Sequence, residues 1–305
     1  MGCHVPNRYR TGMTALSLDA RTVRSTWRST EAVHGMIYFT PDTNETYAKV
    51  GVTHPRAGYF ASRVAALGAA SAELTIATFY NFSPRLIRKH VPMVWDNTTP
   101  HAMLTARLEA VDSSLRRAFG DEMLASAELV ELSEIVREAA LVACESPEGR
   151  ALFAGHAALP WPDEPHLVLW HAQTLVREHR GDGHIAALTC EGLSGLEALI
   201  SHAASGEVPT KILQATRAWS SDQWNAAATT MVDRGLVLDN AGVLSFTELG
   251  QAQRDRIEAT TDRLAAAPYE ALGLDRCNRW RELGKPFAQA VVDAGLLTID
   301  PARYS

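Results

Sequence analysis

The chain has 305 residues, of which 46% are hydrophobic and 21% are charged, and its formal net charge is −6. These values are typical of a soluble globular protein with two domains. No apolar run approaches the roughly 18 residues that a membrane helix needs. The four cysteines have no metal-type spacing and form no even framework in a small domain. We therefore expect a cytoplasmic protein with reduced thiols and no membrane association.

The first half is predicted to be a helical domain, residues 19–157, preceded by a disordered extension over residues 1–18. A helix is predicted over residues 19–37, before the break at Thr40-Pro41-Asp42. The next helices are expected at residues 45–50, 58–67, 72–78, 83–94, 102–119 and 122–144. Only a turn-rich stretch follows Trp95, so no hairpin is predicted in this half.

The second half, residues 158–305, begins with a proline-rich segment that cannot form a helix or a central strand. Helices are expected at residues 166–180, 208–218, 220–234, 247–264 and 276–294. Gly235 ends the third of these. Two short apolar runs then flank Asn240-Ala241-Gly242, which predicts a β-hairpin over residues 236–246.

The two halves also resemble each other. At an offset of 138 residues, the stretch 47–86 aligns with 185–224 without a gap. The identities include Gly68/Gly206, Ala77/Ala215, Thr78/Thr216 and Ser83/Ser221. A second block aligns at an offset of 149, and the added 11 residues match the length of the predicted hairpin. We therefore predict an internal repeat that gives one chain the symmetry of a dimer.

The sequences MVDRGLV and LSFTELGQAQRDRIE, on either side of the hairpin turn, closely resemble those of MarR-like regulators. Longer motifs, such as GYFASRVAALG and ATTDRLAAAPYEALG, resemble the actinobacterial SalK-like helix-turn-helix family from about residue 30 to 297. This resemblance implies a helix-turn-helix regulator but no particular reaction or ligand. We expect a mainly α fold of tandem winged-helix repeats, an intramolecular pseudo-dimer with a small β-wing in the second copy.

Charge argues against tight DNA binding by the second copy. Its expected reading helix, residues 220–234, has no basic residue before Arg234, and the hairpin has none. In the first copy, Arg85, Arg88 and Lys89 lie on one helical face and could contact phosphates. With a net charge of −6, we interpret this face as mainly a solvated surface, so DNA remains a weakly supported partner.

The densest group of ionisable residues lies at 177–184, where Gly181 and Gly183 predict a tight turn between two helices. His179, Asp182 and His184 could act as acid and base, or offer ligands to a metal. The alternative is structural, with Asp182 capping a helix that starts near His184. The residues leave both interpretations open.

The repeat places this cluster opposite the aromatic residues of the first copy, across a shared cleft. Such a cleft suits a small organic ligand, which an arginine beside an aromatic wall would favour as an anion. The candidate ligand-binding residues are Tyr38, Arg63, Tyr80, Asn81, Arg177, His179, Arg180, Asp182 and His184. We expect a ligand-responsive transcriptional regulator; the alternative is an enzyme on a repurposed winged-helix fold, with or without a metal or haem. The sequence does not identify a cofactor.

Overall fold

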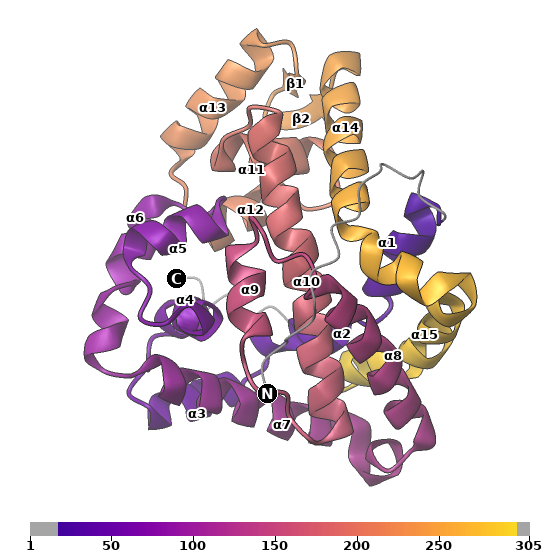
Figure 1. Ribbon diagram of the computed structural model, residues 1–305. Coiled ribbons are helices and arrows are strands. Elements are labelled where there is room, and N and C mark those ends of the chain that lie inside the picture. The colour runs from indigo at the N-terminus through magenta and orange to yellow at the C-terminus, as the bar shows by residue number, and fades with distance from the viewer. Residues whose placement is uncertain (1–17, 298–305) are drawn as a thin grey trace.

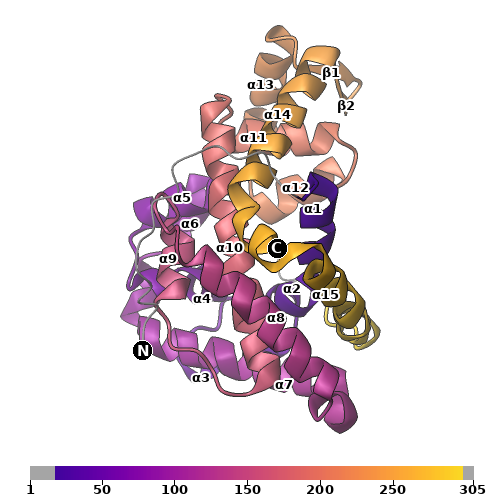
Figure 2. The same ribbon diagram turned by 45° about the vertical axis from the view of Figure 1, so that its right-hand side comes forward.

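A computed structural model describes residues 18–297 of the chain. The predicted extension lies outside these residues except for Leu18, which packs into the core. As predicted, the fold is mainly helical with one small hairpin (Figures 1 and 2). Its elements are α1 Ala20–Arg28, α2 Glu31–Gly35, η1 Met36–Tyr38, α3 Asp42–Lys49, α4 Pro55–Val64, η2 Ala65–Leu67, α5 Ala72–Phe79, α6 Pro84–His90, η3 Met93–Asp96, α7 Pro100–Leu124, α8 Ala127–Ala143, α9 Ala151–Ala157, α10 Pro165–Cys190, α11 Gly195–Ala204, α12 Thr210–Arg217, α13 Ser221–Asp233, β1 Val237–Asn240, β2 Val243–Phe246, α14 Glu248–Ala265 and α15 Ala267–Asp293.

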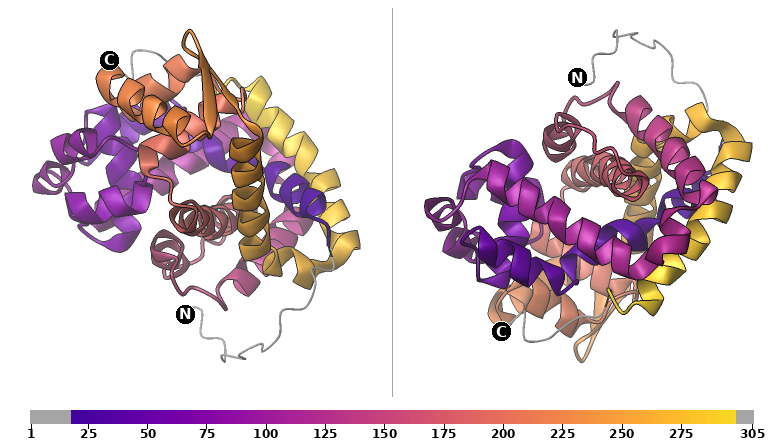
Figure 3. Two further views of the ribbon diagram at one scale, coloured as in Figure 1. Left: turned by 90° about the horizontal axis from the view of Figure 1, so that it is seen from above. Right: turned by 90° about the horizontal axis from the view of Figure 1, so that it is seen from below.

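Helix α10 is the central element, and helices α1, α2, α7, α8, α9 and α14 pack around it (Figure 3). It starts with Pro165 at its first turn, where the missing N–H costs nothing. The tight turn predicted at residues 181–183 is wrong, because α10 continues through both glycines. A glycine inside a helix costs only about 1 kcal/mol. At Gly183 the missing side chain lets the Arg150 guanidinium approach, since a Cβ there would lie 2.7 Å from Arg150 Nη1.

The buried apolar residues form separate clusters. The largest joins α1, α2, α7, α8, α10 and α15, and includes Leu115, Leu132, Leu175 and Trp280. A second cluster joins α11 to α14 and the hairpin to the end of α10, and a third joins α4 to α6 and Leu152 of α9. The molecule therefore has a central helical body that carries two smaller helical units. We call residues 55–90 the first helical unit and residues 195–246 the second.

Only the second unit carries a hairpin in the part of the chain that the structure describes, as predicted. Strands β1 and β2 pair antiparallel, with Asn240 opposite Val243. Ala241 and Gly242 have φ values of 54° and 88°, which the tight turn of a two-residue hairpin requires. The Asp239 carboxylate accepts a hydrogen bond of 2.7 Å from Gly242 N and so stabilises this turn.

The two units meet through the turns inside their helix pairs. Ser83 N donates to the Arg217 carbonyl at 3.0 Å, and Trp219 Nε1 donates to the Asn81 carbonyl at 2.9 Å. Tyr80 lies at the same contact, and a Cβ on Gly195 would come within 1.9 Å of its carbonyl oxygen. Glycine is thus required at residue 195. In residues 18–297, no helix is long and apolar enough to cross a membrane.

Candidate functional site

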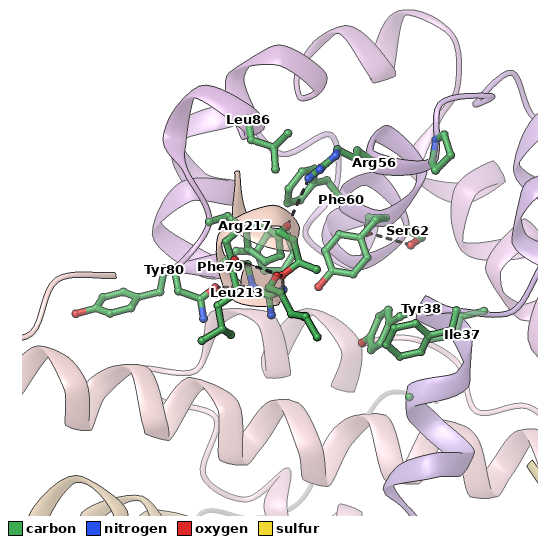
Figure 4. A pocket seen from close by; sticks show the side chains of 18 of the residues that line it. Ile37, Tyr38, Arg56, Phe60, Ser62, Phe79, Tyr80, Leu86, Leu213 and Arg217 are labelled. Carbon is green, nitrogen blue, oxygen red and sulfur yellow. Dashed lines mark hydrogen bonds between the residues drawn. The ribbon is translucent and has the colours of Figure 1, made fainter. Parts of the chain in front are cut away.

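A cavity of about 780 Å³ lies between the two units, with α10 as one wall. Figure 4 shows side chains of the first unit, among them Arg56, Phe60 and Phe79, facing Leu213 and Arg217 of α12. The cavity is rich in aromatic side chains. They are Tyr38, Phe39, Tyr47, Tyr59, Phe60, Phe79, Tyr80 and Phe82. Aromatic side chains together with polar groups in one cavity are the usual form of a small-molecule site.

The cavity lining is positively charged. Four arginines line it, and the only acidic side chain among the described residues that line it is Glu31. These arginines are Arg56, Arg177, Arg217 and Arg254. Four positive charges and one negative charge give a formal sum of +3, in a chain whose net charge is −6. The charge of the lining is thus opposite to that of the whole molecule and favours an anion.

Tyr59 lies at the centre of this lining. Its ring packs against Tyr38, Phe79 and Phe82, with centroids 5.5, 6.4 and 5.6 Å away. Its hydroxyl accepts a 3.0 Å hydrogen bond from Arg63 Nη1. Burial raises the pKa of the Tyr59 phenol, but the charges of Arg63 and its neighbouring arginines outweigh burial and lower it. The hydroxyl can therefore donate its own proton to a bound acceptor.

Arg63 is buried behind this wall and pairs with Glu178 of α10. Its Nη2 lies 3.0 Å from Glu178 Oε1, and Arg177 Nη1 lies at 3.0 Å from the same oxygen. Burial raises the pKa of Glu178, but the two arginines outweigh it and hold this pKa at about 2. Arg177 also pairs with Glu31 at 2.8 Å. This network of two arginines and two glutamates is formally neutral, and it fixes the position of Arg177 in the cavity wall.

Tyr38 reaches the cavity from η1 and is positioned by His34. The Thr174 hydroxyl donates to the Trp170 carbonyl, so it must accept from His34 Nδ1 at 2.9 Å. His34 Nε2 is then the acceptor for the Tyr38 hydroxyl at 2.8 Å. Burial and the nearby arginines hold the pKa of His34 well below its usual value, so this ring is neutral.

His184 of α10 has the same type of partner, a threonine of α14. The Thr261 hydroxyl donates to the Ile257 carbonyl at 2.8 Å, and therefore accepts from His184 Nδ1 at 2.9 Å. Burial lowers the pKa of His184 to about 4. The ring is thus neutral, with its proton on Nδ1 and a lone pair on Nε2.

Of the predicted ligand-binding residues, five line the cavity: Tyr38, Tyr80, Asn81, Arg177 and His184. The Tyr80 ring turns away from the other labelled residues in Figure 4, because its hydroxyl donates to the Leu193 carbonyl. Asn81 accepts from Arg217 Nε at 3.3 Å.

The other four predicted residues, Arg63, His179, Arg180 and Asp182, lie outside the cavity lining. Arg180 pairs with Asp262 of α14 at 2.9 Å. His179 packs edge-on against Phe153 at 5.1 Å. The predicted cap by Asp182 of a helix starting near His184 is wrong. Instead, its carboxylate accepts from Phe153 N at 3.0 Å and so caps α9.

Because successive positions of one helix point in different directions, His179, Asp182 and His184 do not converge on one point. In the part of the chain that the structure describes, no group of three or more histidine, cysteine or acidic side chains could hold a metal. Tyr59 and Arg217 were not among the predicted site residues. The signal for Tyr59 was its position one helical turn before Arg63, within the motif GYFASRVAALG.

The candidate DNA-binding residues Arg85, Arg88 and Lys89 are exposed on α6. Arg88 also pairs with Glu73 at 3.0 Å, with both side chains largely exposed. Helix α13, the second helix of the other unit, carries no basic residue. Positive charge is therefore found on only one of the two helices that could enter a DNA groove.

Comparison with known families shows a match over residues 23–298 to a helix-turn-helix family. The comparison with curated proteins found no match, and neither did the comparison with solved structures. Helix-turn-helix proteins commonly bind DNA through the second helix of the motif. The match covers both helical units and the central body, so the chain belongs to this helix-turn-helix family.

Proposed function

We propose that this protein binds a small organic anion with an aromatic body in the cavity between its two helical units, as a ligand-responsive regulator. The observation that carries this proposal is the charge of the cavity lining. Its formal sum is +3 in a chain whose net charge is −6, and the same lining contains eight phenylalanine and tyrosine side chains. Aromatic faces take up a planar apolar body, and arginines pair with carboxylates through two parallel hydrogen bonds. Tyr59 supplies a further donor.

We also infer that the two units are winged-helix repeats of MarR-like and SalK-like descent, the first without its wing. Helices α5 and α12 support this, because both their first and last residues are 138 positions apart. Gly68 and Gly206 both have positive φ, and so do Tyr80 and Ala218. Each pair is again 138 residues apart. A positive φ at two equivalent non-glycine positions adds support to the sparse identity, although the ψ values of Tyr80 and Ala218, −59° and 39°, differ.

A ligand in this cavity would act on the arrangement of the two units. Arg56 of α4 donates to the carbonyls of Ala215 and Thr216, near the end of α12, at 3.2 and 3.4 Å. Arg217 contacts Asn81 of the first unit. Both arginines also line the cavity. An anion that binds them therefore changes the contacts that hold the two units together.

The position of these units favours a DNA contact through α6 rather than through paired helices. In dimeric regulators the two reading helices lie about 34 Å apart. Here Ser83, which precedes α6, bonds to Arg217, which closely precedes α13. At 1.5 Å per residue, α6 and α13 are about 10 and 20 Å long, so their midpoints lie closer than this spacing. We therefore assign the DNA contact to Arg85, Arg88 and Lys89.

The test is ligand binding by isothermal titration with a matched pair of probes, cinnamate and its neutral amide. We expect the acid to bind at least about tenfold more tightly than the amide, because a charge-assisted hydrogen bond contributes about 1.5–3 kcal/mol. Arg217→Gln should remove most of this preference, and Tyr59→Phe should weaken the binding of the acid. Arg116→Gln, which removes an exposed arginine remote from the cavity, is the control. Equal affinity for acid and amide would refute an anion site.

A further inference from the structure

We propose that His184 makes the cavity selective for ligands that carry a hydroxyl or amino group at the end remote from their acid. This inference rests on the proposed anion site and adds a second recognition point to it. It names the ligand class as hydroxylated or aminated aryl carboxylic acids.

The tautomer of His184 is fixed by its partner Thr261. Thr261 Oγ1 has one proton, which it donates to the Ile257 carbonyl within its own helix. It can then only accept from His184, which places the imidazole proton on Nδ1. The ring is neutral, as burial requires. His184 Nε2 is thus an acceptor and cannot donate.

This acceptor belongs to a residue of the cavity lining. His184 lines the cavity, and no other described residue forms a hydrogen bond with its Nε2. Arg177 precedes it by seven residues, which is two turns of α10, so both side chains lie on one face. The rise between them is about 10 Å at 1.5 Å per residue. Gly181 lies between them on this face and leaves it open.

The environment of His184 combines apolar and charged side chains. The next lining residues on α10, Ile185 and Leu188, are apolar, and Leu199 and Leu213 of the second unit also line the cavity. The charged groups that act on it are those of Glu258, Arg254 and Arg180, with His202 also nearby. Arg254 and Glu258 pair with each other at 2.9 Å. The Nε2 lone pair is therefore the acceptor at this end, and a ligand without a donor would leave it buried and unsatisfied.

The two recognition points define the length of the ligand. The acid faces Arg177, whose charge acts on Tyr59, and the donor reaches His184 about two turns of α10 away. A single benzene ring with directly attached groups is shorter than this span. A ring with a short unsaturated side chain matches it more closely.

The experiment measures the affinities of 4-hydroxycinnamate and cinnamate, with 4-hydroxybenzoate and benzoate as the short pair. We expect the native protein to prefer 4-hydroxycinnamate to cinnamate about tenfold, and the preference to be smaller for the short pair. His184→Phe should reduce it to within about twofold, while cinnamate still binds. Thr261→Val, nearly isosteric, should weaken it because the tautomer is no longer fixed.

Equal binding of the two cinnamates by the native protein would overturn this inference and leave the anion site intact. A preference that survives His184→Phe would overturn it as well, since the hydroxyl would then contact another residue. If neither acid binds, the proposed function itself fails, and the role of His184 fails with it.

Discussion

Replacing His179 with leucine should make the protein less sensitive to acid. His179 is 2% exposed, and its Nδ1 has no hydrogen-bond partner among the described residues. Burial lowers the pKa of this ring to about 3 in the folded protein. In the unfolded chain the value is about 6.5. Because the folded pKa is depressed, the stability is fully present above pH 6.5 and is lost as the pH falls below it.

At pH 5.5 the unfolded chain binds this proton and the folded protein does not, which costs about 1.4 kcal/mol relative to pH 7.5. Burial also lowers the pKa values of other histidines, among them His156 to about 3 and His90, His171 and His184 to about 4, so each of these rings adds a similar cost over this interval. Asp182 acts in the opposite direction, because burial raises its pKa to about 6 and its contribution is lost as the pH rises. It returns about 0.8 kcal/mol over this interval.

We therefore expect the native protein to lose stability between pH 7.5 and 5.5, and His179→Leu to lose about 1.4 kcal/mol less than the native protein. Urea unfolding followed by circular dichroism at the two pH values measures both losses. His101→Leu, at the surface, is the matched control. An unchanged pH dependence in His179→Leu would refute the reasoning. Since His179 lies outside the cavity lining, this variant should also retain ligand binding.

Three further outcomes are expected. Gly195→Ala should lower the free energy of unfolding by roughly 1–3 kcal/mol, because its Cβ would lie 1.9 Å from the Tyr80 carbonyl oxygen. Gly181→Ala, whose Cβ would meet only Glu178 Oε2 at 3.6 Å, should leave the free energy of unfolding unchanged or raise it. Thermal unfolding of both variants compares them directly. Replacing Arg85, Arg88 and Lys89 with alanine should weaken the salt dependence of DNA binding. The slope of log affinity against log salt concentration should become shallower by about one for each phosphate that the protein no longer binds. An unchanged slope would place the DNA contact elsewhere. Asp182→Asn should lose about 0.8 kcal/mol more stability than the native protein between pH 7.5 and 5.5, because the contribution of the raised Asp182 pKa is missing. The same urea experiment measures this difference.

The sequence correctly predicted the elements whose ends and turns depend on residues close together in the chain. The hairpin follows from Asn240-Ala241-Gly242 between two apolar runs, and the structure has a hairpin there. Helix α13 begins after Ser220, which forms a capping box with Gln223. The continuity of α10 could not be predicted in this way, because Gly183 is held in the helix by close contact with Arg150.

The site was predicted less completely because its contacts join distant parts of the chain. The partner of Asp182 is Phe153 N, 29 residues earlier, in a short helix that no sequence pattern indicated. Arg56 and the α12 carbonyl that accepts from it are about 160 residues apart. Side-chain types identified Tyr38, Arg177 and His184 as candidates. Which of them share a cavity depends on tertiary packing.

The location of the cavity determines what its occupation can change. Helix α10 is held by the central body, so Arg177 and His184 are fixed relative to each other. Arg56 belongs to the first unit and Arg217 to the second, and each of them forms a hydrogen bond to the other unit. A ligand that binds groups on α10 and on both units must favour one arrangement of these units over others. Coupling of this kind is reciprocal. If DNA on α6 also favours one arrangement, it changes ligand affinity by the same factor as the ligand changes DNA affinity.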